Sequence, residues 1–205
     1  MNPLLLRRAL WLSYFTLFYN LGEGLVSIVL GLLARSVALL GFGLDSFVEA
    51  LSGAVMVWRF RQAATLSEDE AERREAKAIR LVGWTFLLLG GYVLYECLMK
   101  LYQAEAPAPS RGGLILSVVS LFAMLWLSSL KRRTGEALHS HSLVADSRET
   151  LACAWLSVAL LVGLGLNYLF GLWWADPVAG LVIVVFLLRE GYELLAGEGC
   201  GGEKG

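Results

Sequence analysis

Residues 37–58 read VALLGFGLDSFVEALSGAVMVW, a stretch that is apolar throughout except for small polar residues and two acids, Asp45 and Glu49. A helix of this length spans ~30 Å, the thickness of the hydrocarbon core of a bilayer. The strands of a membrane barrel would alternate apolar and polar residues at period two, and this stretch does not. It therefore predicts a transmembrane helix that carries acidic side chains at bilayer depth.

Comparable apolar segments recur along the chain, which is 57% hydrophobic and only 17% charged. A soluble domain has about 25% charged residues. We expect an all-α membrane protein with six transmembrane helices, at about 9–33, 37–58, 80–102, 113–130, 148–170 and 175–195. Residues 1–196 would form one transport domain and 197–205 a disordered tail. The first segment follows Arg7 and Arg8 but is too long for a removable signal peptide, so we expect it to stay as a span.

Basic residues near the ends of the spans set the orientation. With the N-terminus in the cytoplasm, nearly all of them lie inside, and only Arg35, Lys100 and Arg111 lie outside. Both termini are therefore predicted to be cytoplasmic. We expect a multi-pass protein of a prokaryotic inner or plasma membrane, with the lipid bilayer as a partner. The net charge of −1 gives no support for nucleic-acid binding.

Acidic residues inside the predicted spans indicate a functional site, since each costs about 2.5–3.5 kcal/mol to insert into the membrane at the centre of a helix. Asp45 and Glu49 are four residues apart, as are Glu149 and Cys153, so each pair shares one helix face. Asp146 precedes Glu149 by one turn, towards the predicted inner mouth. The spacing predicts that the two pairs face one cation.

Carboxylates and a thiolate suit a tetrahedral divalent ion such as Zn²⁺, whereas Mg²⁺ and Ca²⁺ prefer oxygen alone. Several like charges in a low dielectric oppose one another's ionisation, so some ligands should hold protons until metal binds. Proton-coupled antiport is the hypothesis that follows. The structural alternative is that these groups join helices through hydrogen bonds worth about 0.6 kcal/mol each.

Three segments also resemble the cation diffusion facilitator family, six-span homodimeric exporters of zinc and related metals. Residues 31–49 (GLLARSVALLGFGLDSFVE) are similar to its second span, 145–157 (ADSRETLACAWLS) to its fifth, and 176–180 (DPVAG) to the start of its sixth. The resemblance covers about residues 10–195. It implies a homodimer and places the four transport-site positions at Asp45, Glu49, Glu149 and Cys153.

The chain also departs from the family pattern. The family often has histidine at the position of Glu149 and aspartate at that of Cys153, so this site is more anionic and softer. The glycine-histidine phrase of the second cytoplasmic loop is absent. We further expect that the family's C-terminal cytoplasmic domain is missing.

Four weaker candidates remain. Glu23 in the first span is expected either to relay protons or to bind a neighbouring group by hydrogen bonds. His139 and His141, in a predicted loop over 131–145, either catch metal at the cytoplasmic entrance or stay unoccupied, and Glu96 is expected to reach water at the outer end of its span.

The sequence predicts a secondary transporter, not an enzyme, that exports a divalent transition metal, chiefly zinc, in exchange for protons. It needs no cofactor beyond the transported ion. No motif for ATP binding or for hydrolysis is present. The alternatives are a non-transporting accessory or sensor subunit, and a carrier of iron, cobalt, manganese or copper.

Overall fold

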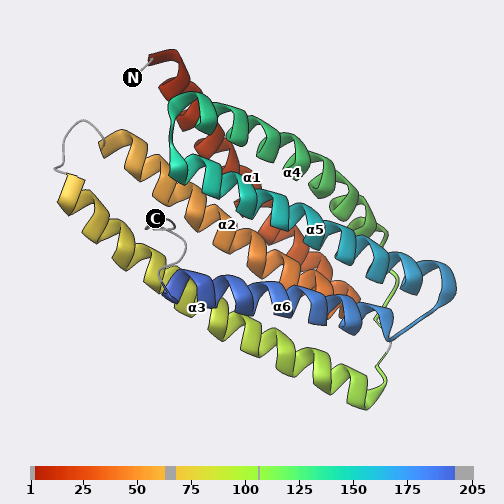
Figure 1. Ribbon diagram of the computed structural model, residues 1–205. Helices are drawn as coiled ribbons and strands as arrows, with labels where there is room; N and C mark the ends of the chain where they lie inside the picture. The colour runs from red at the N-terminus through yellow and green to blue at the C-terminus, as the bar shows by residue number, and fades with distance from the viewer. Residues whose placement is uncertain (1–2, 63–67, 106, 197–205) are drawn as a thin grey trace.

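A computed structural model describes residues 3–62, 68–105 and 107–196, and within them the chain forms six long helices that run side by side (Figure 1). They are α1 (Pro3–Ala34), α2 (Val37–Gln62), α3 (Glu68–Gln103), α4 (Arg111–Leu138), α5 (His141–Phe170) and α6 (Ala175–Ala196). The predicted tail at 197–205 lies outside the described residues. The all-α class is confirmed.

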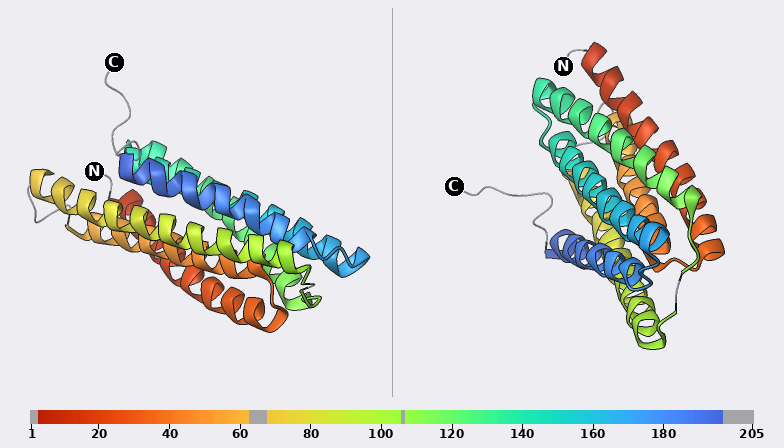
Figure 2. Two further views of the ribbon diagram at one scale, coloured as in Figure 1. Left: turned by 90° about the horizontal axis from the view of Figure 1, so that it is seen from below. Right: turned by 90° about the vertical axis from the view of Figure 1, so that its right-hand side faces the viewer.

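The six helices pack mainly as three antiparallel pairs, α1 with α2, α4 with α5, and α3 with α6. The helix α2 also contacts α3, α5 and α6, so it lies at the centre of the bundle. Figure 2 shows α3 and α6 together on one side, with α1 and α4 on the other. The acidic pair of α2 is therefore placed in the interior.

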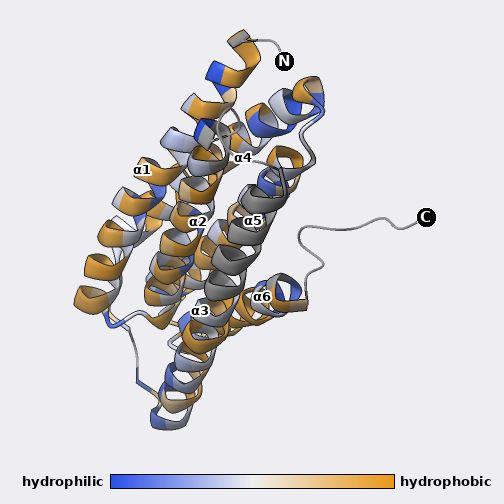
Figure 3. Cartoon of the chain, turned by 90° about the vertical axis from the view of Figure 1, so that its left-hand side faces the viewer, coloured by the Kyte–Doolittle hydropathy of each residue, from blue (hydrophilic) through white to orange (hydrophobic). Residues whose placement is uncertain are grey.

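The bundle has an apolar outside, and many polar side chains are buried in its interior beside an apolar core, unlike in a typical soluble protein. Many large apolar side chains are exposed, including Leu33, Leu88 and Leu169, whereas acids, serines and threonines are buried. Figure 3 shows that apolar residues dominate the length of the helices. Lipid would cover such a surface, so this distribution indicates a membrane protein.

Helices α1 to α5 are each long and apolar enough to cross a membrane. The sixth, α6, is similar in length to α2 but carries Asp176 at its start and Arg189, Glu190 and Glu193 near its end. Its predicted crossing is therefore not supported by composition alone. The orientation of the bundle stays a prediction.

The predicted loop over 131–145 is wrong. The helix α4 continues to Leu138 and α5 begins at His141, so the turn consists of His139 and Ser140. His139 ends α4 with a left-handed backbone, φ 52°. Basic residues beyond an apolar segment mark where the hydrocarbon ends, but a helix can continue past this point when the residues that follow favour helix.

Two close contacts fix α2 in the bundle. A Cβ atom on Gly24 of α1 would lie 3.0 Å from the carbonyl oxygen of Gly43 of α2, so small residues let these two helices approach. At the start of α2, the carboxylate of Asp176 accepts hydrogen bonds from the Val37 amide, at 2.9 Å, and from the Ser36 hydroxyl. A carboxylate at a helix N-terminus accepts hydrogen bonds from free amides and interacts favourably with the positive end of the helix dipole.

Candidate metal-binding site

The acidic faces of α2 and α5 meet inside the bundle. Four hydrogen bonds connect them, and their residue numbers rise along α2 as they fall along α5, which makes the two helices antiparallel. Each predicted pair spans one helical turn, so both members can face the opposite helix. The site is therefore built from side chains on rigid helices.

The contact between Asp45 and Cys153 lies farthest from the α4–α5 turn. The thiol Sγ donates to Asp45 Oδ2 at 3.0 Å, and both residues are buried. One turn along, Thr150 donates to Glu49 Oε1 at 2.7 Å. The other oxygen of Glu49 is buried and has no hydrogen-bond partner among the described residues. A metal that bound here would replace the thiol proton and use this free oxygen.

Glu149 and Asp146 are joined by a hydroxyl of α2. Ser52 lies 3.0 Å from Glu149 Oε2 and 3.2 Å from Asp146 Oδ1. Because a hydroxyl has only one hydrogen, it donates to one carboxylate at a time. The second carboxylate therefore gains this bond only when the serine turns towards it.

Lys131 is a component of the site that the sequence analysis missed. Its Nζ lies 2.9 Å from Asp146 Oδ2 and 2.8 Å from the Thr150 hydroxyl, and its side chain is 0% exposed. Through Thr150 this lysine connects to Glu49. A buried cation thus offsets one of the negative charges at the end of the predicted site nearer the α4–α5 turn.

A pattern in the sequence points to Lys131. Most of the buried residues of α4 follow one another three or four apart, and this spacing continues through Ser128 and Lys131 to Thr134 and Gly135. A solvated loop has no reason to keep helical spacing. The run of three basic residues concealed that the first of them faces inward.

The four predicted ligands do not form one tight cluster. Asp45 contacts Cys153, but Glu49 and Glu149 are each held by a hydroxyl, and within the part of the chain that the structure describes no three His, Cys, Asp or Glu residues lie close enough to hold a metal ion. Binding by all four residues therefore stays a prediction, and it requires small side-chain movements.

The weaker candidates make none of the hydrogen bonds between α2 and α5 described above. Glu23 of α1 accepts hydrogen bonds at 3.2 Å from Tyr19 and from Ser46 of α2, which agrees with the hydrogen-bonding alternative and leaves the relay untested. Glu96 lies on α3, partly buried. His139 caps α4, and the side chain of His141 lies outside the described part of the structure.

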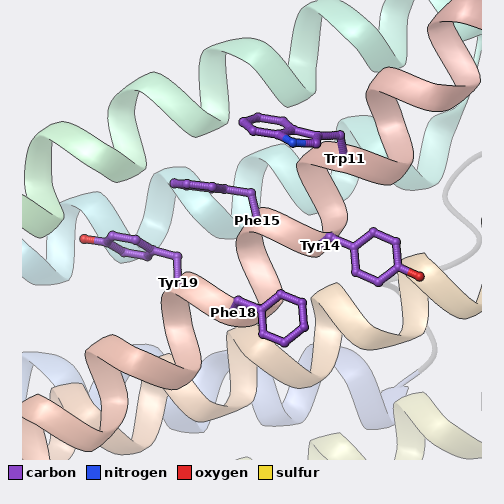
Figure 4. Close-up of a pocket in the computed structure, with 5 residues that line it drawn as sticks. All are labelled: Trp11, Tyr14, Phe15, Phe18 and Tyr19. Carbon is purple, nitrogen blue, oxygen red and sulfur yellow. The ribbon is translucent and has the colours of Figure 1, made fainter.

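A shallow pocket on α1 is aromatic, unlike the polar contact between α2 and α5. It is lined by Trp11, Tyr14, Phe15, Phe18 and Tyr19. Figure 4 shows Phe15 and Tyr19 on one side of α1 and Tyr14 and Phe18 on the other. No acid is among these lining residues, and the Tyr19 hydroxyl donates to Glu23.

The fold and the site together define a multi-pass helical membrane protein with acids, a thiol and a buried lysine in its interior. The family whose model matches residues 13–197 is described as the cation efflux transmembrane domain. The chain belongs to this family. The resemblance to cation diffusion facilitators is thereby confirmed.

Relatives extend across bacteria and vertebrates. The chain is 24% identical over 192 residues to Transmembrane protein 163 of Xenopus laevis, covering 92% of this chain and 66% of that protein. It is 23% identical over 181 residues to the cadmium, cobalt and zinc/H(+)-K(+) antiporter of Bacillus subtilis, covering 84% and 57%. It is 22% identical over 189 residues to Magnetosome protein MamB of Magnetospira, covering 88% and 63%. The chain thus spans less than two thirds of each of these relatives.

Proposed function

We propose that this protein is a divalent transition-metal carrier that moves zinc out of the cytoplasm in exchange for protons. Membership of the cation efflux family and a relative named as a cadmium, cobalt and zinc antiporter support a metal substrate. In this proposal the carrier works as a homodimer in a prokaryotic inner or plasma membrane. The vertebrate relative shows that such domains also occur elsewhere.

The observation that carries the proposal is the contact between Asp45 and Cys153 across α2 and α5, with Glu49 and Glu149 one turn away. A thiol and three carboxylates are an expensive set to bury unless they bind something. Zinc accepts sulfur and oxygen ligands in tetrahedral geometry. The thiol disfavours manganese, which prefers oxygen.

Metal binding at this site would exchange protons and hydroxyl contacts for metal contacts. The Cys153 proton leaves when the sulfur becomes a thiolate ligand, and Glu49 and Glu149 leave the hydroxyls of Thr150 and Ser52. On the other side of the membrane the reverse exchange releases the metal. Rocking of helix pairs about the site would alternate its access.

The test is zinc uptake into proteoliposomes that contain a zinc indicator and carry an imposed pH gradient. We expect accumulation by the wild-type chain and its loss in Asp45→Asn, because this substitution removes a charged ligand. Glu96→Gln is the matched control, an acid of a neighbouring span outside the α2–α5 contact, and should keep transport. Equal uptake in the wild type and Asp45→Asn would overturn the proposed site.

Proton coupling is tested separately with the pH gradient reversed or removed at fixed free zinc. Antiport predicts that zinc flux follows the direction of the gradient. A flux that ignores the gradient would leave a zinc carrier but exclude the exchange for protons.

A specific observation also favours a second candidate, a membrane protein that binds metal without carrying it. Thr150, Ser52 and Lys131 already contact carboxylate oxygens of Glu49, Glu149 and Asp146, as expected of polar groups that serve packing. Zinc binding without zinc accumulation in the same liposomes would select this candidate.

A further inference from the structure

Exposed arginines surround the start of α1. Arg7 and Arg8 belong to α1 itself, Arg61 lies near the end of α2, and Arg133 lies near the end of α4. None of the four forms an ion pair with a carboxylate of the described residues. Their positive charge is therefore available to a ligand.

The pairing of α1 with α2 brings Arg61 to the level of Arg8. A Cβ atom built on Gly53 of α2 would lie 3.3 Å from the Cβ of Thr16 of α1. Arg61 follows Gly53 by eight residues, and Arg8 precedes Thr16 by eight, so the antiparallel packing places the two arginines side by side along the bundle. The Cζ atom of Arg61 lies 5.4 Å from the centre of the Tyr14 ring, which shows that its side chain reaches over α1.

Helix α4 brings Arg133 to the same level from the other side of α1. The rings of Phe15 and Trp126 are in contact, with their centres 5.9 Å apart. Arg8 lies seven residues before Phe15, and Arg133 lies seven residues after Trp126. Seven residues are close to two turns, so each arginine keeps the helix face of its ring. The start of α1 and the end of α4 lie at one end of the bundle and pack against one apolar cluster (Figure 1).

Arginines from three helices thus lie at one level, where they repel one another unless an anion separates them. The described acid nearest to Arg133 along α4 is Glu136, and it is already paired with Arg132 at 2.9 Å. Guanidinium groups bind phosphate through paired, charge-assisted hydrogen bonds. A ligand with a phosphate group therefore suits this arrangement.

The aromatic pocket of α1 begins one turn beyond these arginines. One of its sides is a stacked series of Trp11, Phe15 and Tyr19, with successive ring centres 5.6 Å apart. The other side is Tyr14 and Phe18, with ring centres 6.4 Å apart. Figure 4 shows the two series on opposite sides of the helix. The pocket has a volume of about 390 Å³ and faces the surface that lipid would cover.

The arginines and the pocket match the depth of one lipid leaflet. Arg7, Tyr14 and Phe18 lie on one line along α1, because seven and eleven residues are close to two and three turns. From Arg7 to Phe18 the helix rises by about 16 Å, roughly half of the ~30 Å hydrocarbon core. A ligand with a charged head and an acyl chain therefore fits both parts.

We propose that an anionic phospholipid binds along the start of α1, with its phosphate among Arg7, Arg8, Arg61 and Arg133 and an acyl chain in the aromatic pocket. The head group supplies the specificity, because a lipid tail gains no hydrophobic energy when it moves from lipid to protein within a bilayer. The inference goes beyond the proposed transport of zinc and does not require it.

The experiment uses the purified full chain in phosphatidylcholine vesicles that contain increasing fractions of phosphatidylglycerol with brominated acyl chains. Bromine quenches the fluorescence of a nearby tryptophan, so the difference between the wild type and Trp11→Phe reports the lipid in the pocket. We expect half of the quenching of Trp11 at a lower mole fraction of brominated phosphatidylglycerol than of brominated phosphatidylcholine.

Variants separate a site from a general attraction to basic residues. Arg8→Gln and Arg133→Gln should each raise the fraction of phosphatidylglycerol at half quenching about 5-fold, the effect of about 1 kcal/mol for each arginine near an anionic surface. Arg189→Gln is the matched control and should leave this fraction unchanged. Arg189 is exposed near the end of α6, at the same end of the bundle, but it is paired with Glu193 (Figure 1).

Four results would overturn the proposal. Equal quenching of Trp11 by the two lipids would show that the head group is not recognised, and no quenching by either would show that protein covers the pocket. An equal loss in Arg8→Gln and Arg189→Gln would show attraction by net charge without a site. Reversal of the quenching by inorganic phosphate would show that a free anion occupies the arginines.

The lipid site and the zinc carrier are tested independently. Asp45→Asn, which should abolish zinc uptake, should leave the quenching of Trp11 unchanged, because Asp45 is buried in the α2–α5 contact. Failure of zinc uptake in liposomes, with the preference for phosphatidylglycerol intact, would reject the zinc carrier and leave this site standing.

Discussion

Replacement of Lys131 by methionine should destabilise the bundle strongly. The Nζ of Lys131 lies 2.9 Å from Asp146, and both side chains are almost fully buried. At this distance, two unit charges attract by about 6 kcal/mol at an effective dielectric constant of ~20. The lost desolvation cost of lysine returns part of this energy, so we expect a net loss of about 3–5 kcal/mol, the usual cost of a broken buried pair.

The assay is the thermal midpoint in detergent, where this loss corresponds to roughly 10 °C for a chain of about 200 residues. The same helix supplies a matched control. Arg132 lies 2.9 Å from Glu136, but these side chains are 70% and 57% exposed. Because water screens this pair, Arg132→Met should change stability by about 0.5 kcal/mol or less.

A double variant separates charge from packing. Lys131→Met with Asp146→Asn removes both charges of this pair, so we expect it to recover a large part of the loss. Equal shifts for Lys131→Met and Arg132→Met would refute the reasoning. A double variant less stable than Lys131→Met would refute it too, since the damage would then come from packing.

Three further predictions concern packing, capping and selectivity. Gly163→Ala should lower the free energy of unfolding by about 1–3 kcal/mol, because its Cβ would lie 3.0 Å from a backbone carbonyl oxygen of α6 and against a side chain there. Gly165→Ala has open space and should cost nothing. Equal thermal midpoints for the two variants would contradict this. Asp176→Ala should cost about 1–2 kcal/mol, since it removes the carboxylate that caps α2, and an unchanged midpoint would argue against the cap. Cys153→Ser should weaken zinc relative to manganese in competition binding, because oxygen replaces sulfur; an unchanged ratio would show that the thiol is not a ligand.

The apolar segments predicted the helices well, because crossing a bilayer imposes length and composition on each span directly. They did not predict where the helices end in the charged segments. The segment 80–102 became a helix from Glu68 to Gln103, and 113–130 became Arg111–Leu138. A hydropathy pattern records where lipid ends, but a helix ends where its backbone hydrogen bonds stop, and the charged residues here are strong helix formers.

The sequence predicted those parts of the site in which polar residues recur at helical spacing. It did not predict the contacts that depend on how the helices pack against one another. Two pairs four residues apart identified the faces of α2 and α5 that meet. The contact of Lys131 with Asp146 could not be predicted, because it depends on how α4 rotates against α5. The missing partners of Asn20 were equally invisible, since only the packing of α1 on α2 reveals that its amide is left without a hydrogen bond.

The hydroxyls around the acids bear directly on how a carrier can release what it binds. Ser52 donates to Glu149 at 3.0 Å and Thr150 donates to Glu49 at 2.7 Å. The two oxygens that accept these bonds can therefore exchange a hydrogen bond for a metal contact without passing through an unsatisfied state, which would cost about 1–3 kcal/mol per group. Such exchange lowers the net affinity, and a carrier needs this because a metal held too tightly stays bound. The same reasoning predicts that Thr150→Val, which leaves Glu49 without its donor, binds zinc more tightly and transports it more slowly. A looser zinc site in Thr150→Val would show instead that the threonine positions Glu49 for the metal.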